Sequence, residues 1–368
     1  MLVIFVASHI WERPAKIAMG LRMMGHEVHL VTRIDRLESS IFRNFNSVLT
    51  GIENPIPSLS NFPSSAVIHH FSTAVDQYTV YLLLAKRPFI FDYKDVFPGI
   101  LTLPSDGQDS VLQAIVAQEI PVCHRDGQFA AYMERRGLQE SDKLHFVPDF
   151  TWPNQCPEIG ALVLPATERR RKIVFIGNFS IEALEPKFAG FGQLEIIHAL
   201  VSQNLSYTMY PFRHDRADLN QKLMADYHQM AEKFSNFSLS NRVSRSMLAE
   251  RLRTHGWGSL LLPACHFDEL RDAHYAIRPF TGLAARFSDY LSAGLPIMVS
   301  AENLEASDWI ESYGIGLSIN RAALSSISKM IDDCDYVRLR RNVIDFTRDF
   351  LDWRKCCGKI ISVYNEYF

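Results

Sequence analysis

The stretch of residues 286–300, RFSDYLSAGLPIMVS, carries the clearest structural pattern of the sequence. Its first half predicts a short helix, because Phe287, Tyr290 and Leu291 recur at the spacing that places them on one face. Asp289 falls on roughly the opposite face, turned away from that packing surface. The helix therefore has an apolar side for the core and a carboxylate on its other side.

The second half of the stretch predicts the end of the helix and the start of a strand. Gly294 suits the left-handed conformation that closes a helix, and Pro296 prevents its continuation. The apolar run 297–299 is typical of a strand that is buried on both faces, as in a parallel sheet. Asp289 is therefore expected beside the edge of such a sheet, which is where ligands of open α/β folds bind.

Composition limits the size and the class of the protein. A length of 368 residues predicts two domains, and a hydrophobic content of 47% is ample for their cores. The 38 basic and 41 acidic residues give a formal net charge of -3, which argues against nucleic acid as the main partner.

Two absences in the sequence narrow the class further. The apolar start, residues 1–7, has no preceding basic region and no cleavage-like segment, so it predicts a strand of a cytoplasmic protein. The six cysteines form no CxxC pair. Neither a zinc ribbon nor a redox motif is indicated, and no metal site is expected.

Apolar patterns predict alternating strands and helices along the chain. Residues 2–7 form the first strand, a helix runs to about Met24, and residues 28–32 form the next strand, which is a βαβ start. No glycine lies between Ala7 and Gly20, so the dinucleotide fingerprint is missing and NAD binding loses its main support. Further strands are expected at 66–71, 89–91, 120–123, 144–150, 172–176, 207–212, 258–263 and 314–319, and further helices at 74–85, 108–117, 127–136, 192–203, 215–234, 246–253, 336–351 and 354–367.

Prolines mark the boundary between the two expected domains. Four of them fall within residues 148–170, which is typical of a linker. The predicted division is a first Rossmann-like domain (1–150), a linker (151–170), a second Rossmann-like domain (171–335) and C-terminal helices (336–368).

The stretch around Asp289 resembles the nucleotide-sugar-dependent glycosyltransferases of the GT-B fold, of the kind found in bacterial polysaccharide biosynthesis. In their second domain many of these enzymes carry an acidic residue, a small-residue helix, Gly-x-Pro and an apolar strand. Here the acidic residue is Asp289, and 294–296 supply Gly-Leu-Pro. The resemblance implies an α/β fold of two Rossmann-like domains that face each other across a cleft, with C-terminal helices that cross back to the first domain.

A second resemblance lies in the first domain. Asp92 and Asp95 match the acidic positions of a strand that ends in Asp-x-His-Glu/Asp in bacterial polysaccharide transferases, although Lys94 stands where the histidine often is. If the reaction inverts, a base must take the proton of the acceptor. The candidate catalytic residues are Asp95 and Asp92, followed by His9 in the loop after the first strand.

The resemblance also implies a donor site in the second domain. Asp289 would hold the ribose, while arginines and backbone N–H groups would hold the diphosphate without a metal. For each arginine a surface ion pair is an equally good explanation, and a plain turn accounts for Gly177. The candidate donor-binding residues are Asp289, Arg286, Arg278, Gly282, Thr281, Gly177, Asn178 and Arg213.

The function implied is transfer of a sugar from a nucleotide-sugar donor to a saccharide or lipid-linked acceptor, with no resident cofactor. Lipid-linked acceptors would bring the protein to the inner face of the membrane, where Arg33, Arg36 and Arg43 offer weak basic contacts. Two alternatives stay open, a GT-B sugar epimerase and a non-catalytic GT-B partner subunit. The second is favoured by the missing glycine loop and by Thr281, which replaces the first residue of the family's acidic pair.

Overall fold

The computed structural model divides the chain into two compact units. Unit 1 comprises Met1–Asn154 and Phe350–Phe368, and unit 2 comprises Gln155–Asp349. The structure describes residues 1–34, 39–72, 76–93, 106–138, 141–153, 167–177, 193–211, 217–240, 243, 245–262 and 283–368.

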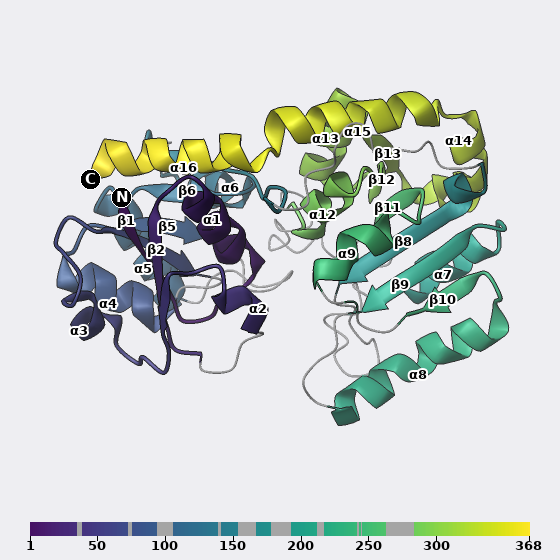
Figure 1. The fold of residues 1–368 in the computed structure, drawn as a ribbon. Coiled ribbons are helices and arrows are strands. Elements are labelled where there is room, and N and C mark those ends of the chain that lie inside the picture. Colours follow the sequence, from purple (N-terminus) through teal and green to yellow (C-terminus); the bar gives the residue numbers. More distant parts are fainter. Residues whose placement is uncertain are drawn as a thin grey trace. The chain divides into compact units, whose positions relative to one another are not determined.

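Unit 1 is a seven-stranded parallel sheet with helices (Figure 1). The strand order is β3-β2-β1-β4-β5-β6-β7, so the order reverses between β1 and β4. The strands are β1 (Leu2–Ala7), β2 (Glu27–Thr32), β3 (Ser47–Leu49), β4 (Val67–Ser72), β5 (Ile90–Tyr93), β6 (Val122–His124) and β7 (Leu144–Phe146). The helices are α1 (Glu12–Met23), α2 (Ser39–Phe42), α3 (Pro55–Leu59), α4 (Gln77–Ala85), α5 (Asp106–Ala117), α6 (Gln128–Arg135) and α16 (Trp353–Tyr367).

Unit 2 repeats the plan with a six-stranded parallel sheet in the order β10-β9-β8-β11-β12-β13, which reverses between β8 and β11. The strands are β8 (Lys172–Gly177), β9 (Ser206–Pro211), β10 (Phe237–Leu239), β11 (Trp257–Leu260), β12 (Ile297–Ser300) and β13 (Gly316–Ile319). The helices are α7 (Leu194–Val201), α8 (Ala217–Lys233), α9 (Arg245–Leu252), α12 (Arg286–Ser292), α13 (Leu304–Tyr313), α14 (Ile327–Asp333) and α15 (Tyr336–Phe350).

The expected alternation of strands and helices is confirmed, and two three-residue strands were missed. The missed strands, β3 and β10, are edge strands at the ends of their sheets. Three residues are too few to show a periodic pattern. The helix expected at the start of 286–300 is present as α12, and Gly294 after it has a φ of 74°, the left-handed conformation expected of a helix stop.

The two C-terminal helices belong to different units, which corrects the expectation for 336–368. Helix α15 packs on unit 2, where Arg340 donates from Nε to the carbonyl of Gly294 at 3.2 Å. Helix α16 packs on unit 1, where the hydroxyl of Tyr364 lies 2.7 Å from Nδ1 of His69. The sequence predicts both helices, but no local pattern indicates that they bury their apolar faces on separate cores.

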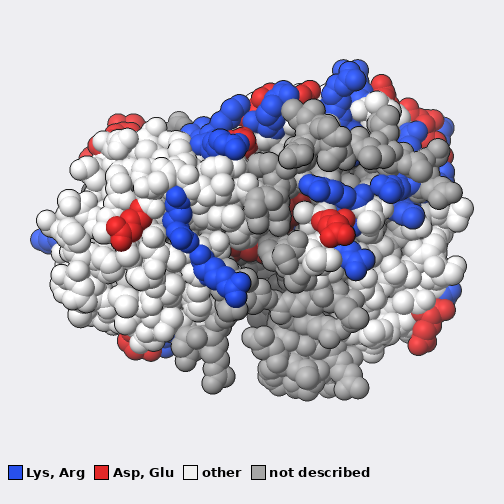
Figure 2. Space-filling view, in the orientation of Figure 1, with Lys and Arg blue, Asp and Glu red and all other residues white. Residues whose placement is uncertain are grey.

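Two surface properties bear on partners. On the face drawn in Figure 2, Lys and Arg side chains of the described residues lie in separate short groups with acidic side chains among them. The described residues on that face therefore form no broad basic stripe for nucleic acid. Within the described ranges, no helix combines the length and the apolar composition needed to cross a bilayer.

Helices α1 and α16 approach each other at Gly20. A Cβ atom built on Gly20 would lie 2.4 Å from Sγ of Cys357 and 3.3 Å from Cε3 of Trp353. We expect Gly20→Ala to destabilise the protein by about 1–3 kcal/mol, because the two helices must move apart. Thermal unfolding measures the effect.

Gly358, in the middle of α16, is the matched control for this prediction. Its Cβ would meet no atom within 4 Å. Gly358→Ala should therefore stabilise the helix by up to about 1 kcal/mol through propensity alone. Shortening the partner side chain in Gly20→Ala/Cys357→Ala should recover part of the loss, and equal melting temperatures for Gly20→Ala and wild type would contradict the close contact.

Candidate functional site

Each sheet has a topological switch point, where the strand order reverses. In unit 1 this point lies between β1 and β4, and in unit 2 it lies between β8 and β11. In open α/β sheets the neighbouring loops diverge at this point, so the carboxyl edge there forms a crevice for ligands. A predicted ligand-binding or catalytic residue is therefore supported by the fold if it lies at one of these two edges.

Tyr290 of α12 closes the switch point of unit 2. The β8–β11 ladder pairs Val174 with Gly258 and goes no further. Beyond it, the hydroxyl of Tyr290 accepts from the N–H of Ile176 at 2.9 Å and donates to the carbonyl of Ser259 at 3.1 Å. One hydroxyl thus takes the place of a strand-to-strand hydrogen bond where the two strands separate.

Gly258 makes this arrangement possible. A Cβ atom at this position would lie 2.3 to 2.7 Å from the ring atoms of Tyr290. The ring therefore lies directly on the backbone of β11, and it is completely buried. The bonded, buried hydroxyl fixes α12, and with it the side chains one turn away, relative to the end of β8.

Arg286 lies at that end of β8. Its Nη1 donates to the carbonyl of Ile176 at 3.1 Å, and its guanidinium carbon lies 4.6 Å from the ring centroid of Phe175. The next residue, Gly177, has a φ of 133°, and a Cβ there would lie 2.7 Å from Nη1 of Arg286. The structure thus brings together two of the predicted donor-binding residues, a guanidinium and a glycine turn.

Asp289 lies one helical turn after Arg286 and is 9% exposed. The sequence placed it away from the packing face, but α12 is buried on every side from Phe287 to Ser292. Helix α9 and strands β11 and β12 all contact α12, which explains why a carboxylate opposite the apolar face is still enclosed. Residues three apart on a helix are neighbours, so Asp289 and Arg286 lie near each other on α12.

The remaining donor-binding candidates and one catalytic candidate lie outside the described residues. They are Arg278, Thr281, Gly282, Asn178, Arg213 and Asp95.

Removing the hydroxyl of Tyr290 tests the closure of this edge. In Tyr290→Phe the ring still fits on Gly258, but the buried N–H of Ile176 loses its partner. We expect a loss of about 1–3 kcal/mol in the free energy of unfolding. Chemical denaturation measures it. Tyr81→Phe, whose hydroxyl accepts an exposed hydrogen bond from Gln77, should change stability by less than about 0.5 kcal/mol.

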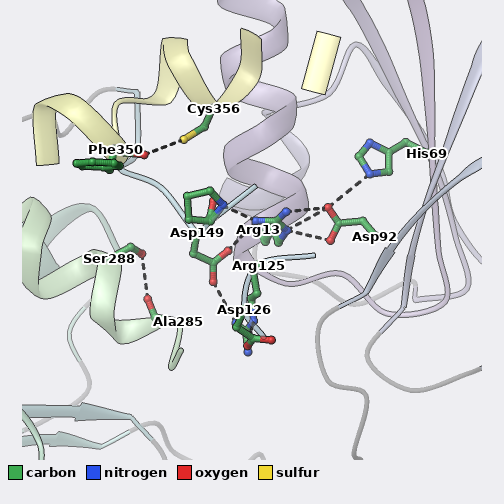
Figure 3. Close-up of polar contacts among 11 residues, drawn as sticks. Arg13, His69, Asp92, Arg125, Asp126, Asp149, Ala285, Ser288, Phe350 and Cys356 are labelled. Carbon is green, nitrogen blue, oxygen red and sulfur yellow. Dashed lines mark hydrogen bonds and ion pairs between the residues drawn. The ribbon is translucent and has the colours of Figure 1, made fainter. Parts of the chain in front are cut away.

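A buried ion-pair network supports the carboxyl edge of unit 1, and its centre is Arg13 of α1 (Figure 3). The guanidinium binds both oxygens of Asp92, with Nε at 2.9 Å from Oδ1 and Nη2 at 3.0 Å from Oδ2. Its Nη1 donates to Asp149 at 3.2 Å, and Arg125 binds the other oxygen of Asp149 at 3.0 Å. The network ties α1 to the ends of β5 and β7.

The position of Asp92 does not suit a base for a substrate. The residue is completely buried, and its two oxygens are occupied by Arg13. Burial alone would raise the pKa of Asp92, but the charge of Arg13 and the hydrogen bond to His69 outweigh it and lower the pKa below the usual value. Asp92 is therefore a carboxylate that is kept ionised inside the unit, and its geometry fits a structural role.

Three residues at this network are of types that can bind a metal ion. The ligand atoms of His69, Asp92 and Cys123 all lie within 4.8 Å of one another. The donor set does not fit a cation. Arg13 already fills the carboxylate, and burial raises the pKa of the Cys123 thiol, which keeps it protonated. This cluster is an ion-pair network packed on a histidine and a thiol.

Arg13→Met tests how far unit 1 depends on this network. Two carboxylates would lose their buried partner, so we expect a loss of about 3–5 kcal/mol at pH 7. The pKa values of Asp92 and Asp149 are lowered from 3.8, so the contribution of the pair is complete above pH 4 and is lost as the pH falls below it. Denaturant unfolding at pH 7 and pH 3 should show the difference between variant and wild type shrinking in acid.

A surface pair in the same unit serves as the control. Arg136 contacts Asp109 at 3.1 Å and is 37% exposed. Arg136→Met should cost less than about 1 kcal/mol. Equal losses of unfolding free energy in Arg13→Met and Arg136→Met would contradict a special structural role for Arg13.

His9 is the catalytic candidate with an exposed side chain among those described. It follows Ser8 at the carboxyl end of β1, and its Nδ1 lies 3.1 Å from Oγ of Ser8. Ser8 donates in turn to Oδ2 of Asp76, which precedes α4. Because β1 and β4 flank the switch point, His9, Ser8 and Asp76 meet at the edge where a ligand of unit 1 is expected.

Sequence reasoning missed Arg13, Ser8 and Asp76. Asp76 carried a usable signal, since an Asp directly before a helix suggests an N-cap. Arg13 and Asp92 are 79 residues apart in the sequence, and no local pattern connects them.

No protein-family model matches the chain, and no curated protein matches its sequence. Solved structures match it over its whole length. An Anabaena protein, HepE in complex with UDP and glucose, has 12% identity over 100% of both chains and a TM-score of 0.65. The chain has the GT-B fold.

Two further GT-B structures match this chain equally well. Sucrose-phosphate synthase from Thermosynechococcus elongatus has 14% identity and a TM-score of 0.64, over 100% of this chain and 99% of the synthase. An α,α-trehalose-phosphate synthase (UDP-forming) from Burkholderia xenovorans, in complex with glucose-6-phosphate, has 10% identity and a TM-score of 0.64, over 99% of this chain and 100% of the synthase. At such identities the likeness establishes the fold.

Proposed function

We propose that this protein is a glycosyltransferase that moves a sugar from a nucleotide-diphosphate donor to a saccharide or lipid-linked acceptor. The observation that carries the proposal is the guanidinium of Arg286 at the Gly177 turn, on the switch-point edge of unit 2. The GT-B fold over the full length supports it, because one neighbour holds UDP and glucose and another is a UDP-forming synthase.

The chemistry of donor cleavage explains why an arginine belongs at this edge. The bond that breaks leaves negative charge on a nucleoside diphosphate, and preorganised donors stabilise such charge. Arg286 offers a planar fork of N–H donors, and the missing Cβ of Gly177 lets its guanidinium lie against the turn at the end of β8. In this proposal the guanidinium stabilises the negative charge on the diphosphate in place of a metal ion, and transfer requires no metal.

Asp289 completes the donor site in the proposal. A carboxylate accepts hydrogen bonds from two hydroxyls, which is the chemistry that a ribose offers. Asp289 lies one turn from Arg286 on α12, which puts a carboxylate for the ribose hydroxyls next to a guanidinium for the phosphates in this proposal. Arg278, Thr281, Gly282, Asn178 and Arg213 stay in the proposal as further donor contacts.

The acceptor belongs to unit 1 in this proposal. Asp92 is occupied by Arg13, so the proposed contacts to the acceptor are His9 and Asp95. The proposal extends to a hexose donor, to cell-surface polysaccharide assembly in a bacterial cytoplasm and to contact with a membrane through basic residues such as Arg33 and Arg43. These finer points rest on the resemblance of the sequence.

Thermal stabilisation by free nucleotides tests the donor site. We expect one nucleoside diphosphate among UDP, GDP, ADP, TDP and CDP to raise the melting temperature selectively. At a hundredfold excess over its dissociation constant the gain in stability is about 2.7 kcal/mol. Arg286→Gln and Asp289→Asn should each abolish most of that gain, because they remove the phosphate and ribose contacts.

Arg338→Gln is the matched control, since Arg338 is an exposed arginine on α15 of the same unit. It should keep the full response. Conversion of the matching nucleotide-sugar to free nucleotide and altered sugar without any acceptor would favour an epimerase. No response to any nucleotide would contradict the proposal and favour a non-catalytic GT-B subunit.

A further inference from the structure

The three side chains at the switch point of unit 1 form a continuous hydrogen-bonded chain. Nδ1 of His9 lies 3.1 Å from Oγ of Ser8, and Ser8 donates to Oδ2 of Asp76. His9 is exposed, Ser8 is half-buried and the side chain of Asp76 is 20% exposed. The chain therefore runs from the surface towards the body of the sheet.

The positions of the protons in this chain follow from the donor inventory of the side chains. An ionised carboxylate can only accept hydrogen bonds, so the single hydroxyl proton of Ser8 must point to Asp76. Oγ of Ser8 then has only lone pairs to offer to His9. Nδ1 of His9 must carry the ring proton, and Nε2 of the neutral ring is left with a free lone pair.

Asp76 is held in place independently of His9. Its Oδ1 accepts from the backbone N–H of Thr79 at 3.1 Å, as the N-cap of α4, and lies 3.6 Å from Nε2 of His70. Burial lowers the pKa of His70, so this ring is neutral and does not cancel the charge of Asp76. Asp76 can therefore act on Ser8 as a fixed, charged acceptor.

We propose that Ser8 and Asp76 are positioning residues that hold His9 in the Nδ1–H tautomer and so present the Nε2 lone pair to a hydroxyl group of the substrate. For the identity of that substrate the inference rests on the proposed glycosyl transfer. A hydroxyl-bearing sugar matches a site whose exposed ring nitrogen accepts a hydrogen bond.

The tautomer can be measured directly, without any assumption about activity. In protein labelled with 15N-histidine, long-range proton–nitrogen correlation spectra at alkaline pH distinguish a protonated from a bare ring nitrogen. His9→Gln identifies the signals that belong to His9 among those of the 13 histidines. We expect the wild-type ring to carry its proton on Nδ1, with Nε2 bare.

Asp76→Asn is the decisive variant, because it separates the helix cap from the proton chain. Asn caps a helix as well as Asp does, so α4 keeps the bond to Thr79. The amide N–H₂ of Asn then faces Ser8 as a donor, the Ser8 hydroxyl turns to donate to Nδ1, and the proton of His9 moves to Nε2. We expect Ser8→Ala to give a mixture of tautomers and Ser8→Thr to restore the wild-type form.

Turnover provides the second measurement. Ser8→Ala should lower kcat/KM by about tenfold, the factor of one lost hydrogen bond, and Asp76→Asn should lower it further, while the nucleotide-induced rise in melting temperature stays unchanged. Ser8→Thr should restore turnover. A general loss of structure would instead lower both kcat/KM and the nucleotide response.

Three outcomes would overturn the inference: a wild-type His9 with its proton on Nε2, the same tautomer in all variants, or full turnover in Asp76→Asn despite an inverted tautomer. The nucleotide experiment fails separately. If the tautomer pattern appears as expected but no nucleotide stabilises the protein, the proton chain stands and the glycosyltransferase proposal falls.

Discussion

The candidate donor site depends on the way Tyr290 joins two diverging strands. Parallel strands must separate at a switch point to open a crevice, and that leaves backbone groups without ladder partners. The Tyr290 hydroxyl satisfies the N–H of Ile176 and the carbonyl of Ser259, and Gly258 provides the space for the ring. The helix that carries Arg286 and Asp289 is thereby fixed to both strands, so the edge can be open to a ligand without losing order.

Unit 1 meets the same constraint with charges instead of an aromatic ring. Arg13 binds the carboxylates of Asp92 and Asp149 in a fork geometry that positions α1 against the strand ends. A buried pair of this kind contributes little net stability over an apolar core, but losing one partner is costly. Asp92, although it lies at a strand end, is therefore kept in place by its need for Arg13. The exposed candidate side chain at the same edge is that of His9.

Local patterns predicted the elements because they repeat over many residues, and they predicted α12 because the apolar spacing and Gly294 agree. They also selected Arg286 and Gly177, which the fold brings into contact. They could not show that Asp289 is enclosed, since that depends on α9, or that Asp92 is occupied, since Arg13 is distant in the chain. The Ser8–Asp76 contact was equally invisible, because it spans 68 residues and two neighbouring strands.

Hydrogen exchange with bound nucleotide is the sharpest test of the donor site on unit 2, because it reports where the ligand lies and not only that it binds. We expect a stabilising nucleoside diphosphate to slow exchange in the segments 173–177 and 283–292 of unit 2, and Arg286→Gln to abolish this protection. Protection confined to unit 1, or to segments of unit 2 remote from β8 and α12, would rule out a donor site at Arg286.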